Sequence, residues 1–115
     1  MAHHIDRVPS PPIDALLNHA TRLLVEAAHP EKIILFGSHA RGDFDADSDL
    51  DLLIILPICV DRFEEMVRLR LVLRDIPMPI DVIVYSRADV EERQHLRGTM
   101  LYHALREGRV LYDAA

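Results

Sequence analysis

The stretch from Ile33 to Leu56 constrains this chain most, because two apolar runs flank a polar, acidic segment. Both runs are short and rich in Ile and Leu, which is typical of buried strands. Gly37 ends the first run and lets the backbone turn and approach a ligand, and Ser38 adds a hydroxyl and an N–H group. Asp49 and Asp51 open the second run, and the two-residue period of a strand places them on one face.

Carboxylates at the mouth of a buried strand are costly unless a cation lies between them, so this pair indicates a metal site. A third carboxylate, Asp81, stands at the start of a β-branched run over 80–85. The crossover between the runs at 50–56 and 80–85 favours parallel pairing, which would bring the three acids to one end of the sheet. If the strand at 33–36 is antiparallel to 50–56, the Gly-Ser turn reaches the same edge.

The remaining sequence predicts alternating helices and strands. A helix is expected to open at Pro11 or Pro12 and to end just before Pro30. Further helices are expected over 61–74 and 87–107, with a short edge strand at 110–112. Residues 1–11 are expected to be a flexible leader, and residues 12–115 a single domain.

Composition excludes several classes of protein. The chain has 115 residues, half of them hydrophobic, which suits one folded domain with a modest core. A formal charge of −6 argues against non-specific nucleic-acid binding. A single cysteine, Cys59, cannot form an internal disulfide, and we find no signal peptide and no apolar run of about 20 residues. These features favour a cytoplasmic protein without a membrane segment.

Three clustered acids suit chemistry on a nucleoside triphosphate. Two Mg²⁺ ions can clamp the attacking and leaving oxygens of an in-line displacement, and carboxylates are their usual protein ligands. Asp49 and Asp51 would hold both ions, and Asp81 would help to lower the pKa of the attacking group. Ser38 and nearby N–H groups would hold the outer phosphates, and Arg41 would offset their charge.

Two other interpretations of the acidic segment compete with this one. The alternating acids from Asp43 to Asp51 suggest a calcium loop, but an EF-hand that starts at Asp43 would place Ser48 and Ile54 where it needs Gly and Glu. Alternatively, the acids form a solvated surface turn. We favour that reading for Asp43 and its neighbours Asp45 and Asp47, but not for the carboxylates that open apolar strands.

In these residues the chain resembles the minimal nucleotidyltransferases of the DNA polymerase β-like superfamily. The motif of that family is Gly-Ser, ten residues, then Asp-x-Asp, and Gly37-Ser38 and Asp49-Leu50-Asp51 stand at this spacing. Ala40-Arg41-Gly42, Ser48 before the acids, and Asp81 on a later strand extend the match. The ending Glu107-Gly108-Arg109-Val110-Leu111-Tyr112 also resembles the family, so the resemblance covers roughly residues 12 to 113.

The resemblance implies an α/β (α+β) nucleotidyltransferase fold with a small mixed sheet backed by helices. It implies transfer of AMP from ATP with two Mg²⁺ ions as cofactors. Asp49, Asp51 and Asp81 would be catalytic and would bind the metal. The nucleotide would be bound by Gly37, Ser38, Arg41 and Ser48.

The family also suggests a partner. MntA-like members of this size are often antitoxins that adenylylate a tyrosine of a HEPN-domain ribonuclease toxin, and larger relatives add an acceptor-binding domain. His39 occupies a variable position of the motif and is assigned no role. Alternatives are a non-catalytic module that neutralises its partner by contact, and an enzyme that modifies a small molecule such as an antibiotic. Apolar helix faces also allow a homo-oligomer. The metal site would be undone if Asp81 pointed away from Asp49 and Asp51, or if a salt bridge already occupied the space between them.

Overall fold

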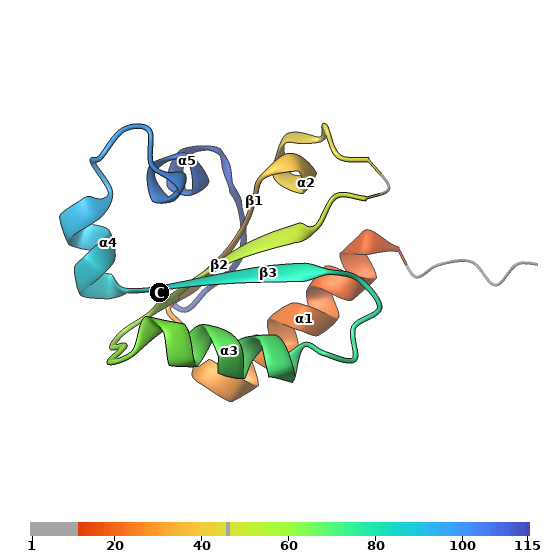
Figure 1. Ribbon diagram of the computed structural model, residues 1–115. Helices are drawn as coiled ribbons and strands as arrows, with labels where there is room; N and C mark the ends of the chain where they lie inside the picture. Colours follow the sequence, from red (N-terminus) through yellow and green to blue (C-terminus); the bar gives the residue numbers. More distant parts are fainter. Residues whose placement is uncertain (1–11, 46) are drawn as a thin grey trace, which may run out of the picture.

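The computed structural model describes residues 12–45 and 47–115 (Figure 1), so the predicted leader at 1–11 lies outside the described residues. The described elements follow one another in the order α1 (Ile13–Ala28), β1 (Lys32–Phe36), α2 (Ser38–Arg41), β2 (Leu50–Leu56), α3 (Arg62–Val72), β3 (Ile80–Ser86), α4 (Arg87–Arg93), α5 (Met100–Glu107) and β4 (Arg109–Asp113). The three predicted strands and the predicted edge strand are confirmed.

The four strands form one mixed sheet in the order β3-β2-β1-β4. β2 and β3 are parallel, as the crossover through α3 predicts, whereas β1 is antiparallel to both β2 and β4. In this register Asp51 is paired with Phe36 on one side and with Asp81 on the other. The sheet therefore brings the end of β1 and the starts of β2 and β3 to one edge, and the expected mixed sheet is confirmed.

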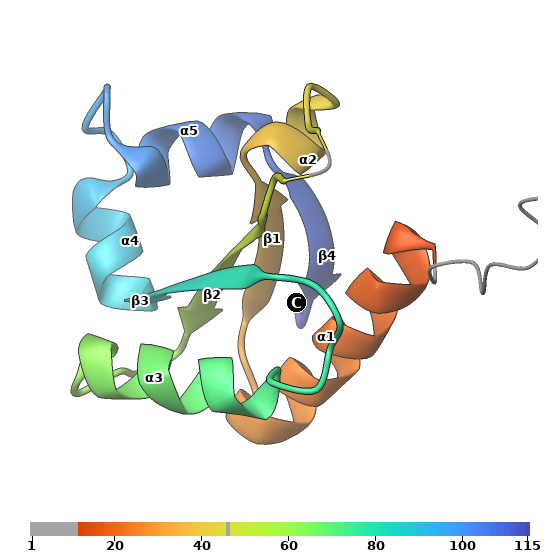
Figure 2. The same cartoon turned by 45° about the vertical axis from the view of Figure 1, so that its right-hand side comes forward.

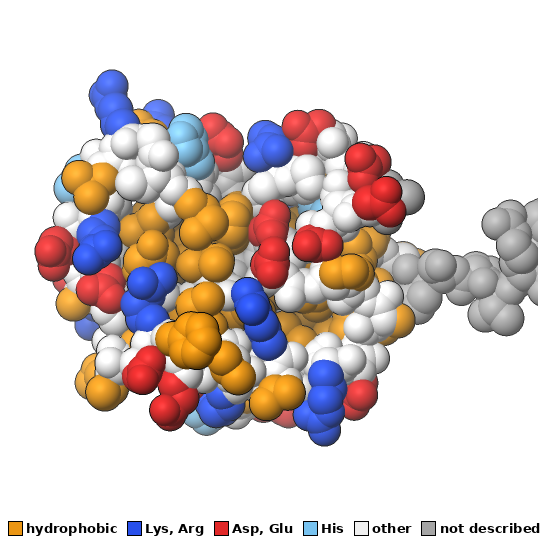
Figure 3. Space-filling view, viewed as in Figure 1, with side chains coloured by type: hydrophobic (Ala, Val, Ile, Leu, Met, Phe, Trp, Pro, Cys, Tyr) orange, Lys and Arg blue, Asp and Glu red, His pale blue; other side chains and the backbone are white. Residues whose placement is uncertain are grey.

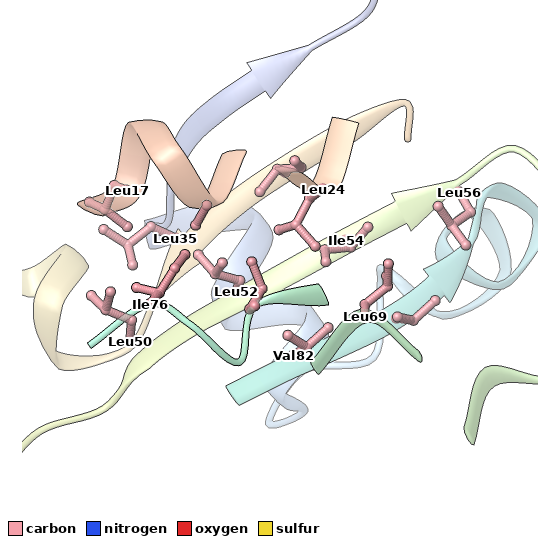
Figure 4. Packing of buried hydrophobic residues seen from close by; sticks show 14 residues of the cluster. Leu17, Leu24, Leu35, Leu50, Leu52, Ile54, Leu56, Leu69, Ile76 and Val82 are labelled. Carbon is pink, nitrogen blue, oxygen red and sulfur yellow. The ribbon is translucent and has the colours of Figure 1, made fainter. Parts of the chain in front are cut away.

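Helices cover both faces of the sheet (Figures 1 and 2): α1 and α3 lie on one face, and α4 and α5 on the other. Alternate residues of β2 divide between two cores, because successive side chains of a strand point to opposite faces. Leu52 belongs to the larger core, with Leu17 of α1 and Leu69 of α3 (Figure 4). Leu53 belongs to the smaller core, with Leu101 of α5.

The predicted single helix over 87–107 is wrong, because the chain forms two helices there. α4 ends at Arg93, and Gly98 adopts a positive φ of 82° in the connection. Thr99 then caps α5, since its side chain accepts a hydrogen bond from the amide of Tyr102 (3.1 Å). A glycine in this conformation followed by a capping threonine ends one helix and starts another.

One side of α3 remains exposed. Asp61 caps this helix by accepting from the amide of Glu64 (3.0 Å), and Leu69 packs into the core. Three apolar side chains of the same helix, Phe63, Val67 and Leu71, are exposed instead. Within the described ranges, no helix has the length and apolar character that crossing a membrane requires.

Substitution of Leu52 by Ala should test the position of the larger core. Leu52 is fully buried, so we expect its loss to lower the free energy of unfolding by about 2–5 kcal/mol. Leu71→Ala removes the same atoms from an exposed position and should change it by less than about 0.5 kcal/mol. Urea denaturation measures both, and equal effects would contradict this packing.

Candidate active site

Gly37 brings the backbone directly against Asp51. It follows β1 immediately, and its φ of 76° and ψ of −155° lie in a region that is essentially restricted to glycine. A Cβ atom at this position would stand 2.4 Å from Oδ2 of Asp51, which is closer than two such atoms can approach. Glycine is therefore required at this position both by its conformation and by the neighbouring carboxylate.

The turn after Gly37 carries the other predicted phosphate-binding residues. Ser38 begins α2, and the amides of Ala40 and Arg41 donate to the carbonyl of Gly37 (3.1 Å each). Arg41 is exposed and pairs with Asp43 (3.2 Å). Gly37, Ser38 and Arg41 thus lie on one short segment beside the start of β2, where a bound anion would meet N–H, hydroxyl and guanidinium groups.

Ser48 lies in the loop before β2, and its polar groups have partners within that loop. Its hydroxyl oxygen accepts from the amide of Asp45 (3.0 Å), and the hydroxyl lies 3.3 Å from Oδ1 of the same residue. Asp45 also accepts from the amide of Asp47 (2.9 Å), and Asp43, Asp45 and Asp47 are all exposed. These three acids form the solvated surface turn that the sequence predicts, and nucleotide binding by Ser48 stays a prediction.

The three predicted metal-binding acids lie at the same edge of the sheet. Asp51 is half-buried and is paired in register with Asp81, and Asp49 precedes it by two residues. Burial is the largest cause that raises the pKa of Asp51 above its ordinary value, and the charges of Asp81 and Asp49 raise this pKa further. The charges of His39 and Arg41 act in the opposite direction. Acidic side chains gather in this region of the surface (Figure 3).

Arg70 of α3 already contacts Asp81. One of its terminal nitrogens lies 3.4 Å from Oδ1 of Asp81, and the two side chains are 48% and 51% exposed. An exposed ion pair contributes about 0–1 kcal/mol, so a divalent cation can displace it. This salt bridge meets part of the condition that would undo the metal site, because it already holds Asp81, but such an exposed pair is too weak to exclude a cation.

The side chains as they stand are not assembled around a single point. Within 12–45 and 47–115, no group of three His, Cys, Asp or Glu side chains has the arrangement that would hold a metal ion. The chemistry of the donor set still fits Mg²⁺, which prefers oxygen ligands. Asp51 and its register partner Asp81 supply carboxylates, and Asp49 supplies a third two residues before Asp51. Asp81 and Asp49 both raise the pKa of Asp51, and a cation bound among the three acids would offset this repulsion further than Arg41 and Arg70 do.

A cavity of about 550 Å³ lies at the opposite end of the sheet, away from these acids. Its charged lining residues are largely paired with one another, as Arg87 is with Glu31 and Lys32 is with Asp113 (3.7 Å). None of the predicted site residues lines this cavity. The clustered acids and the close approach of Gly37 favour the other end.

Sequence reasoning missed two residues of the site, His39 and Arg70. His39 occupies a variable position of the motif, so the sequence assigns it no role, yet it is one of the groups that lower the pKa of Asp51. Arg70 stands two helical turns after Arg62, which donates to the carbonyl of Val84 on β3 (2.6 Å). That spacing puts both arginines on the side of α3 that faces β3. The spacing was therefore the feature of the sequence that could have indicated a contact between Arg70 and β3.

Comparisons with known proteins show the family to which the chain belongs. A family model described as polymerase beta nucleotidyltransferase matches residues 18–115. A relative from Methanocaldococcus jannaschii, "Putative protein adenylyltransferase MJ0604", is 36% identical over 84 residues, which cover 71% of this chain and 78% of the relative. The chain therefore belongs to the polymerase beta nucleotidyltransferase family, and it is a nucleotidyltransferase.

Solved structures show the same fold. A "putative nucleotidyltransferase" from Sulfolobus solfataricus has a TM-score of 0.61 at 19% identity, covering 87% of this chain and 79% of its own. Two toxin–antitoxin structures, one with AMP-PNP and one of an MntA-HpeT mutant, each have a TM-score of 0.54. They are 21% and 19% identical, and each covers 84% of this chain and 73% of its own.

Substitution of Gly37 by Ala should damage the site more than the same change at Gly42. Both glycines have positive φ, but a Cβ at Gly42 would meet nothing within 4 Å. We expect Gly37→Ala to lower the free energy of unfolding by about 1–3 kcal/mol and to displace Asp51. Magnesium affinity, measured by calorimetry with a non-hydrolysable ATP analogue, should fall about tenfold or more in Gly37→Ala only. Equal affinities in the two variants would contradict the role of this contact.

Asp51→Asn should raise the melting temperature of the metal-free protein at pH 7. The pKa of Asp51 is raised in the folded state, so ionisation costs stability as pH rises from its ordinary value through the raised one. The cost is complete above the raised pKa and absent below the ordinary value. The difference between variant and parent should therefore shrink as pH falls towards about 4. A variant that is less stable than the parent at pH 7, measured by calorimetric scans, would contradict the clustering.

Proposed function

We propose that this nucleotidyltransferase transfers AMP from ATP to a hydroxyl group of a partner protein in the cytoplasm, and that the partner is a HEPN-domain toxin which this modification silences. The observation that carries the proposal is the register of the sheet, which aligns Asp81 with Asp51 beside the Gly37 turn. The relative MJ0604 bears the name of a protein adenylyltransferase, and toxin–antitoxin structures share the fold.

The residues divide the chemistry among them. Asp49 and Asp51 would hold two Mg²⁺ ions together with Asp81, and the ions would supply charge stabilisation for the phosphates and a lower pKa for the acceptor hydroxyl. Ser38 and the adjacent N–H groups would hold the outer phosphates. Arg41 would offset the charge of these phosphates, and Ser48 would also contact the nucleotide. The side chain of Asp81 at the start of β3 is half-exposed, so an acceptor approaching from solvent could reach it.

The reaction that these groups support is a displacement at the α-phosphorus of ATP. The acceptor oxygen forms a bond to that phosphorus, the bond to the bridging oxygen breaks, and pyrophosphate leaves. Asp81 would help to lower the pKa of the acceptor hydroxyl, which would lose its proton as it attacks. Arg70 would release Asp81 when the site is filled, because its single exposed contact is weak.

Transfer of label to the partner tests this proposal. The purified protein, Mg²⁺ and the product of the adjacent gene should give a labelled partner with α-labelled ATP but not with γ-labelled ATP. Asp51→Asn should lower the rate by roughly a hundredfold or more, on the scale seen when a charge-stabilising group is lost. Asp47→Asn makes the same change on the exposed turn and should leave the rate within about twofold.

Two outcomes would contradict the proposal. Transfer of the γ-label would indicate phosphoryl transfer instead of AMP transfer. An Asp51→Asn variant that cannot transfer label, yet still protects cells from the partner as well as the parent does, would indicate a module that neutralises the toxin by contact.

A further inference from the structure

His39 connects α2 to the loop that leads into β2. Its Nε2 lies 3.2 Å from the carbonyl oxygen of Ser48, and because a carbonyl can only accept, the ring donates this hydrogen bond through Nε2–H. The same ring stacks on Phe44, with centroids 4.3 Å apart and planes inclined by 15°. A half-buried imidazole therefore contacts the loop at two places, one early and one late in its course.

The local turn in this loop does not by itself fix where the loop lies. Hydrogen bonds between Asp45, Asp47 and Ser48 close a turn, and the amide of Ser48 also donates to the carbonyl of Asp45 (3.2 Å). These contacts set the shape of the turn, because they all join residues within it. The bond from His39 differs, since it joins the residue before Asp49 to α2 and hence to the Gly37 turn.

Asp49 lies between two anchored peptide groups. On its C-terminal side, the amide of Leu50 donates to the carbonyl of Pro79 (3.0 Å), which ties the start of β2 to the residue before β3. On its N-terminal side, the Ser48 carbonyl belongs to the same planar peptide unit as the amide of Asp49. Fixing that carbonyl fixes the direction in which the chain enters Asp49, and the ring of His39 is what contacts it.

We propose that His39 is a positioning residue for Asp49, whose ring holds the Ser48–Asp49 peptide so that the Asp49 carboxylate stays beside Asp51. The importance of that position for metal binding rests on the proposed function, whereas the anchoring of the peptide does not. Phe44 supports the ring by stacking on it and is itself 49% exposed, so this aromatic pair lies on the surface of the loop.

Three variants separate the hydrogen bond from the stacking. His39→Gln retains an N–H donor at a similar reach but loses the ring. His39→Phe retains the ring and loses the donor, and His39→Ala loses both. His95→Ala is the matched control, because His95 is exposed in the connection between α4 and α5 and lies far along the chain from this loop.

Hydrogen exchange of the Ser48 and Leu50 amides, without metal or nucleotide, is the first measurement. We expect exchange to be about fivefold faster in His39→Ala and His39→Phe, the change that corresponds to one lost hydrogen bond. His39→Gln and His95→Ala should stay within about twofold of the parent. Should His39→Ala fail to fold by circular dichroism, the comparison of Gln with Phe still decides. Unchanged exchange in His39→Phe would overturn the proposal, because stacking alone would then hold the loop.

Magnesium-dependent thermal stabilisation, with a non-hydrolysable ATP analogue present, is the second measurement. The Mg²⁺ concentration for half-maximal stabilisation should rise about fivefold in His39→Ala and His39→Phe and return to the parent value in His39→Gln. Faster exchange without this shift would mean that His39 orders the loop but does not position Asp49, which overturns the proposal. A parent that Mg²⁺ does not stabilise would contradict the proposed function, while the exchange rates would still report on the anchoring of the peptide.

Discussion

The contact between the Gly37 backbone and the Asp51 carboxylate is the constraint on which the rest of the site depends. It exists because β1 and β2 pair antiparallel with Phe36 opposite Asp51, so the chain leaves β1 beside that carboxylate. Only glycine has both the conformation and the space that this approach requires. The parallel pairing of β2 with β3 then sets Asp81 opposite Asp51 from the other side. Backbone pairing thereby places the predicted phosphate-binding turn beside two of the carboxylates that are predicted to hold cations.

This packing brings the negative charges of the three acids together, and basic side chains nearby offset part of them. Burial and two neighbouring acids raise the pKa of Asp51, while His39 and Arg41 lower it, and Arg70 contacts Asp81 from α3. Ion pairs of exposed arginines contribute little to stability, so these side chains offset part of the charge of the acids without closing the site. A nucleotide carrying divalent cations would bring a stronger compensation to the same positions. Relief of the repulsion among these acids would then favour binding of the metal-nucleotide complex.

Much of this architecture was predictable, for reasons that differ from element to element. β1 and β2 are short apolar runs bounded by Gly37 and Pro57, and the Gly-Ser and Asp-x-Asp spacing places the site residues around them. The break between α4 and α5 was missed because Val90 and Leu101 keep a spacing that one continuous helix also allows, and the conformation of Gly98 outweighs it. The contact that His39 makes spans nine residues of loop, and Arg70 meets Asp81 only after a helix packs on a strand. Periodicity describes neither kind of contact.

The most direct test of this account is the anomalous scattering of manganese in crystals grown with Mn²⁺ and a non-hydrolysable ATP analogue. The account predicts manganese peaks beside the carboxylates of Asp49 and Asp51, and one of these peaks should also lie beside Asp81. The phosphates should lie against the Gly37 turn, and Arg70 should have turned away from Asp81. Crystals that hold the nucleotide elsewhere, or that retain the contact between Arg70 and Asp81 with no manganese at the three acids, would contradict it.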